Sequence, residues 1–217
     1  MAAARRADGL TLAGLIALAL IPVAAGFFRL ALLAAGGPQT AANSRFFAAP
    51  TPVVLHIVSV TIFSLLGAVQ FVPGVRHGRP AWHRAAGRVV GVAGLGAATS
   101  GIWMASSYAI VPADSALLHG FRLLFGWAMV FALALGVIAI LRKDIVRHQA
   151  WMRRAYAIGL GAGTQALIQI PPLVLFGEPG DTGRALMMGA GWVVNLAVAE
   201  WLTRTAPPGT PRPNSHA

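Results

Sequence analysis

Four of the six histidines in this chain lie where two pairs of them could each bind one cofactor. His56 and His119 fall a few residues inside two apolar segments, and His83 and His148 stand just before two others. If these segments are consecutive antiparallel helices of a bundle, alternate helices are diagonal and their histidines can face each other across the core. A low-spin haem iron takes two such imidazoles, one on each face of the porphyrin.

Arginines lie close to each predicted pair. Arg122 follows His119 by three residues, on a neighbouring face of the same helix, and could bind a haem propionate at the outer surface. Arg88 and Arg153, together with Arg84, could do the same at the inner surface. The predicted site is therefore one or two haem b groups with His56, His119, His83 and His148 as iron ligands, and Arg122, Arg88 and Arg153 as propionate partners.

The same residues have a second interpretation that involves no cofactor. The stretches "RHGRPAWHRAAGR" (76–88) and "VRHQAWMRRAYA" (146–157) are basic and aromatic, as the interfacial ends of membrane helices are. Histidine is common at such ends without any chemical role. The residues alone leave both interpretations open.

Composition requires a membrane protein. Of the 217 residues, 57% are hydrophobic and 11% charged, against roughly 25% charged in soluble domains. Six apolar windows reach the length of about 20 residues that a spanning helix needs. The prediction is an all-α, polytopic fold with the second to fifth helices as a four-helix core, and with spans at about 10–35, 53–73, 86–107, 116–140, 155–176 and 184–203.

Basic residues predict the orientation. Only Arg29, Arg45, Arg122 and Arg184 of the 17 basic residues fall on one side of these spans. By the positive-inside rule the other side, with both termini, is cytoplasmic. The first span is expected to be a retained anchor, and residues 205–217 form a Pro-rich tail predicted to be disordered.

Several classes of function are disfavoured. The net charge of +11 is explained by topology, so no nucleic-acid partner is expected in a chain this apolar. The absence of cysteine excludes disulfides and thiolate metal sites. No paired carboxylates, Ser-His-Asp set or P-loop is present, and no acidic residue lies in the middle of a span; Glu200, near a helix end, is expected to snorkel or to pair with a loop arginine.

Small residues and prolines mark two further features. The stripe Gly87, Gly91, Gly94 and Ala98 and the run "GLGAG" (159–163) indicate close helix packing or, alternatively, a face for a flat ligand. Pro171 and Pro172 are expected to end or bend the fifth span near the outer surface.

The segments "LHIVSVTIFSLLGAVQF", "RPAWHRAAGRVVG" and "RHQAWMRRAYAI" resemble the bacterial predicted-membrane-protein family called domain of unknown function 2306, over about Leu55 to Leu175. The resemblance implies a multi-pass protein of the bacterial inner membrane. It implies no particular activity.

A more distant likeness is to the cytochrome b-561 and ferric-reductase-like superfamily. Its ligands lie on helices 2 and 4 for one haem and on helices 3 and 5 for the other, the order of His56, His119, His83 and His148 here. The likeness implies a b-type cytochrome-like oxidoreductase or electron carrier in the bilayer, with a quinone or another redox partner. The alternative is a non-redox membrane protein, namely an assembly factor, a small-molecule permease or a structural component.

Overall fold

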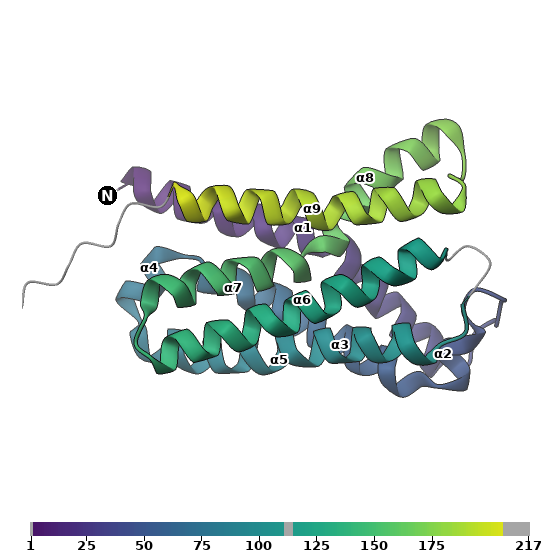
Figure 1. Ribbon diagram of the computed structural model, residues 1–217, viewed down its shortest axis with the longest axis horizontal. Coiled ribbons are helices and arrows are strands. Elements are labelled where there is room, and N and C mark those ends of the chain that lie inside the picture. Colours follow the sequence, from purple (N-terminus) through teal and green to yellow (C-terminus); the bar gives the residue numbers. More distant parts are fainter. Residues whose placement is uncertain (1, 111–114, 206–217) are drawn as a thin grey trace, which may run out of the picture.

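The computed structural model describes residues 2–110 and 115–205. All regular structure in these two ranges is α-helix, which confirms the predicted fold class (Figure 1). The helices are α1 (Ala2–Ala34), α2 (Ser44–Ala48), α3 (Pro50–Gln70), α4 (Pro73–Gly78), α5 (Pro80–Ser107), α6 (Ala116–Leu141), α7 (Ile145–Gly159), α8 (Gly161–Phe176) and α9 (Asp181–Arg204).

Six segments of the described chain are long and apolar enough to cross a membrane, as predicted. They are α1 from Arg6 onward, α3, α5, α6, the pair α7 and α8, and α9. Two of these spans, those that begin with α5 and α7, start well before the residues that hydropathy indicated. Pro80 opens α5 in the first turn, where its missing N–H costs no hydrogen bond, and Asp144 caps α7 by accepting from the Arg147 N–H at 3.0 Å.

These early starts correct the predicted position of two histidines. His83 and His148 do not precede their helices but lie within the first turns of α5 and α7. Both side chains are half-buried.

The fifth span ends where predicted, but it is also divided at a position that the sequence did not predict. The chain turns at Leu160, between α7 and α8, whereas α8 continues as helix through Pro171 and Pro172 to Phe176. Backbone groups at membrane depth need partners, and the Asn195 side-chain amide donates to the Ala157 carbonyl beside the break at 3.0 Å.

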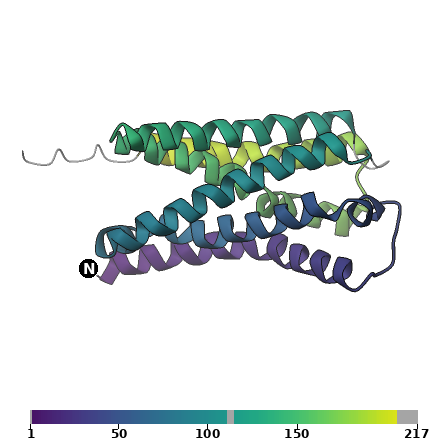
Figure 2. The same ribbon diagram turned by 90° about the horizontal axis from the view of Figure 1, so that it is seen from below.

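Four helices form the core, and the others cover it. The helices α3 and α6 each pack against both α5 and α7, so α3 and α6 are diagonal neighbours, as predicted for the second and fourth spans. Figure 2 shows α1 along the α3 side of this core and α9 on the α6 side. Thus two diagonal helices, α3 and α6, carry His56 and His119.

Small residues allow the closest approaches. The ring of Phe63, 2% exposed, occupies the space that a side chain at Gly94 or Gly159 would fill. In the same way Trp192 of α9 packs on Gly161. At these positions the glycines serve helix packing, the first of the two predicted interpretations.

The bundle has two ends of different character. The basic end holds α4, the turn at residues 142–144 and the C-terminal end of α9, and Figure 1 shows the N-terminus at this same end. The cavity end holds α2 and residues 108–110. That the basic end faces the cytoplasm stays a prediction. The tail from residue 206, which was predicted to be disordered, lies outside the described residues.

Candidate functional site

A cavity of about 320 Å³ opens between the helices at the cavity end, and both His56 and His119 line it. This volume lies at the lower limit of ordinary cofactor and ligand pockets, which run from roughly 300 to 1,000 Å³. Its walls come from α2, α3 and all of the helices from α5 to α9. The structure therefore brings one predicted pair of histidines to a shared cavity.

His56 is held by the neighbouring helix α5. Its Nδ1 lies 3.0 Å from the Ala97 carbonyl oxygen and 3.1 Å from the Ser100 Oγ. Because a carbonyl only accepts, Nδ1 carries the proton in this arrangement, and Nε2 of the neutral ring is left with its lone pair. Histidines that bind metals usually donate their other N–H to a carbonyl or carboxylate in this way.

His119 lies in the first turn of α6. The Ser115 hydroxyl caps this helix by accepting from the Leu118 N–H at 3.2 Å, and Leu118 itself is fully buried. Half-buried His119 lines the cavity together with Arg122, Phe125 and other residues one and two turns further along α6. Because residues three apart lie near each other on a helix surface, His119 and Arg122 both line the wall that α6 forms.

The end wall of the cavity contains residues that the sequence interpretation missed. Arg45 and Phe46 of α2 line it, and Arg45 Nη1 donates to the Ala109 carbonyl at 3.1 Å. The Tyr108 hydroxyl donates to the Ala49 carbonyl at 2.6 Å, and its ring lies edge-on to Phe46 with centroids 5.4 Å apart. A five-residue helix has too short a pattern to be found from the sequence.

The deeper wall is apolar with one amide. Phe125 and Trp192 stack with ring centroids 4.7 Å apart. Gln165 is 5% exposed, and its Nε2 donates to the Met188 carbonyl of α9 at 2.9 Å. A mostly apolar pocket with a few fixed polar groups is typical of cofactor sites.

The second predicted pair has different surroundings. His83 and His148 lie within electrostatic range of each other, but neither lines the cavity. The His148 Nδ1 donates to the Gly136 carbonyl of α6 at 2.9 Å, and the side chains of Met152 and Trp151 pack against Gly136. The structure brings this pair together in a region where α6 and α7 pack closely.

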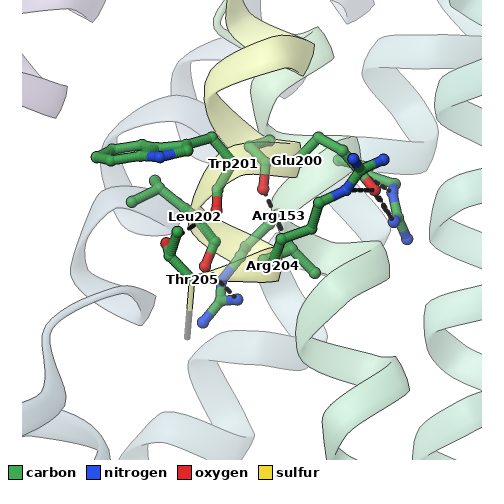
Figure 3. Close-up of polar contacts among 9 residues, drawn as sticks. Arg153, Glu200, Trp201, Leu202, Arg204 and Thr205 are labelled. Carbon is green, nitrogen blue, oxygen red and sulfur yellow. Dashed lines mark hydrogen bonds and ion pairs between the residues drawn. The ribbon is translucent and has the colours of Figure 1, made fainter. Parts of the chain in front are cut away.

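The predicted arginines are distributed between the two ends. Arg122 lines the cavity, whereas Arg88 is exposed on α5. Arg153 donates to the Leu202 carbonyl of α9 at 3.5 Å (Figure 3). Beside it, Arg154 donates to both carboxylate oxygens of Glu200 at 3.0 Å, so this glutamate pairs with an arginine as one of the two predictions had it, although Arg154 lies in α7 and not in a loop.

The arrangement limits which metals could bind. Within the described ranges no three or more histidine, aspartate or glutamate side chains gather in one place. A conventional zinc or manganese site, with three or more protein ligands, therefore has no basis in this part of the chain. His56 and His119 line one cavity from two different helices, and their role as haem ligands stays a prediction.

Comparison with known proteins gives a family but no relative of known activity. The family model described as "Predicted membrane protein (DUF2306)" matches residues 53–203, more than half of the chain and nearly all of α3 to α9. The match extends beyond the predicted limit at Leu175. No curated protein matches and no solved structure does, so the likeness to cytochrome b-561 stays a prediction. With six apolar spans around a shared core, the chain is an integral membrane protein that belongs to the DUF2306 family.

Proposed function

We propose that this protein binds one haem b in the cavity, where His56 and His119 would hold the iron, and that it carries electrons within the membrane. The observation that carries the proposal is that one cavity is lined by a histidine from each of two diagonal core helices, α3 and α6. Diagonal helices of a bundle can each supply one histidine to a haem in the core between them.

The surroundings of His56 support its role. The Ala97 carbonyl at 3.0 Å holds the Nδ1 proton, which fixes the tautomer with a basic Nε2. Gly101 faces the same ring, because a Cβ placed there would lie 3.4 Å from the His56 Cε1. Gly101 also lines the cavity, and because it has no side chain it leaves this part of the cavity open.

The charge of the cavity also fits haem b. Arg45 and Arg122 lie on its wall, and a haem carries two propionates that guanidinium groups can bind. Phe125, Met129 and Trp192 supply apolar contacts for the porphyrin faces and exclude water from them. A bound haem would supply reversible one-electron chemistry, tuned by its ligands and by burial.

Absorption spectroscopy tests the proposal directly. The full chain, expressed with added haem precursor and purified in detergent, is expected to show a Soret band and a sharp α band after reduction. His56→Ala and His119→Ala should each remove most of this absorbance. His77→Ala is the matched control, since His77 is exposed on α4 and lies outside the cavity.

Two results would contradict the proposal. One is a folded, colourless protein obtained when haem is in excess, which would favour the non-redox alternative. The other is haem absorbance that survives both substitutions in the cavity. Circular dichroism and gel filtration of each variant show whether the fold is retained.

A further inference from the structure

The basic end contains a group of arginines and histidines to which no described carboxylate is directed. His83 lies within electrostatic range of Arg76, Arg84 and His148, and Arg153 lies within range of Arg76. These five residues, here called the basic cluster, come from α4, α5 and α7. Like charges brought together in this way destabilise one another unless an anion lies between them.

The acidic side chains of this end have other partners. Glu200 pairs with Arg154 at 2.8 Å and with Arg204 at 3.6 Å. Asp144 accepts from the backbone N–H of Arg147 at 3.0 Å. Asp8 accepts from the backbone N–H of Gly74 at 3.2 Å, so each of these carboxylates is directed to a group outside the basic cluster.

One buried polar atom in the cluster also lacks a partner. The His83 Nδ1 is buried, and no group in the described part of the chain makes a hydrogen bond with it. A buried nitrogen without a partner costs free energy. An anionic oxygen accepting from an Nδ1–H at this position would remove that cost and would also neutralise the neighbouring arginines.

The helices α4 and α5, which carry Arg76 and His83, also border a hollow that suits an acyl chain. A cavity of about 400 Å³ lies between α3, α4 and α5 and is lined by apolar Val69 and Val75, the Trp82 indole, Gly74, Gly78 and Arg79. Trp82 is 40% exposed, and tryptophan is typical of the level of the lipid headgroups. An apolar wall with a guanidinium at its edge matches a lipid better than a free ion.

We propose that the basic cluster and the adjoining cavity bind an anionic phospholipid, with the phosphate among Arg76, His83 and Arg153 and an acyl chain along Val69, Val75 and Trp82. The site lies at the ends of the spans, where the headgroups of a bilayer would be. Guanidinium groups bind phosphate oxygens by paired, charge-assisted hydrogen bonds. This proposal does not depend on haem.

A titration with lipids of matched chains tests it. The full chain in neutral detergent is titrated with mixed micelles that contain phosphatidylglycerol or phosphatidylcholine, and binding is followed by the fluorescence of the tryptophans or by native mass spectrometry. Arg76→Gln combined with Arg153→Gln is expected to weaken phosphatidylglycerol binding about 30-fold, from the attraction of two arginines at a membrane surface.

The matched control removes the same number of positive charges from other residues at the basic end. Arg142→Gln combined with Arg147→Gln removes two exposed cations outside the basic cluster. Because salt screens the attraction of exposed charges for a phosphate bound elsewhere, this variant should weaken binding less than about threefold. Equal losses in the two double variants would overturn the proposal, as would equal binding of the two lipids. Inorganic phosphate that competes as strongly as the lipid would also overturn it. If the first double variant does not fold, Arg76→Gln against Arg142→Gln makes the same comparison.

Discussion

The two pairs of histidines in this bundle share a residue type and a diagonal arrangement, yet they have opposite surroundings. In the cavity pair, His56 and His119 line a common cavity of about 320 Å³. In the basic-end pair, His83 and His148 lie within electrostatic range of each other where the helices pack closely. His56 and His148 each direct Nδ1 to a backbone carbonyl of a neighbouring helix, at 3.0 and 2.9 Å.

The comparison shows that orientation of the ring does not distinguish the two pairs. A carbonyl on Nδ1 fixes the ring, whether the ring then binds a cofactor or only joins two helices. What differs is the space around the ring. Beside His56 stands Gly101, with no side chain, whereas near His148 the side chains of Met152 and Trp151 already fill the space at Gly136.

The largest expected effect on the difference between the two pairs comes from filling the cavity beside His56, which should lower haem affinity. Gly101→Leu places a side chain beside the His56 ring, since a Cβ at this position already lies 3.4 Å from Cε1. Overpacking costs up to about 3 kcal/mol, so haem affinity is expected to fall roughly 100-fold. Titration of the purified apoprotein with haem, followed at the Soret band, measures this affinity.

The control for this variant lies on the same helix. Gly91→Leu adds the same side chain at a position where a Cβ meets no atom within 4 Å, so haem binding should stay within about threefold of the unmodified protein. If Gly101→Leu binds haem as tightly as Gly91→Leu, the cavity is not the haem site.

The sequence was sufficient for the broad architecture. Six apolar segments and their short connections predicted six spans and the diagonal relation of the helices that carry His56 and His119, because both follow from hydropathy and chain order. It was not sufficient for the helix starts. Polar residues such as His83 and His148 lower the hydropathy of the first turn of a span, although Pro80 and Asp144 can start a helix there.

The break in the fifth span shows a further limit. Pro171 and Pro172 were expected to end or bend the span near the outer surface, and α8 contains both and ends at Phe176. The turn that was not predicted occurs at Leu160, beside Gly161, where Trp192 of another helix packs. A contact between α8 and α9 cannot be found from the local sequence. For the same reason α2, which closes the cavity with Arg45, was missed.

A second prediction concerns the basic-end pair, and the expected change, in the free energy of unfolding, is of intermediate size. His148→Ala removes the hydrogen bond to the Gly136 carbonyl and should lower the free energy of unfolding by about 1 kcal/mol. For a chain of this size the midpoint of thermal unfolding in detergent should fall by roughly 2–4 °C. Haem absorbance per mole of folded protein should stay unchanged. Loss of absorbance with an unchanged midpoint would show instead that His148 is an iron ligand, and the two pairs would then be alike.

The smallest expected effect distinguishes the two partners of His56. Ser100→Ala removes the hydroxyl 3.1 Å from Nδ1 but leaves the Ala97 carbonyl at 3.0 Å, so the ring keeps its orientation. Since hydrogen bonds between membrane helices contribute about 0.6 kcal/mol on average, haem affinity should fall only about threefold. Ser107→Ala, which removes an exposed hydroxyl bonded to the Trp103 carbonyl on the same helix, should leave affinity unchanged. A tenfold or larger loss in Ser100→Ala alone would show that the hydroxyl, rather than the carbonyl, orients His56. The two pairs would then differ in two ways: in the space around the ring, and in the Ser100 hydroxyl that orients His56.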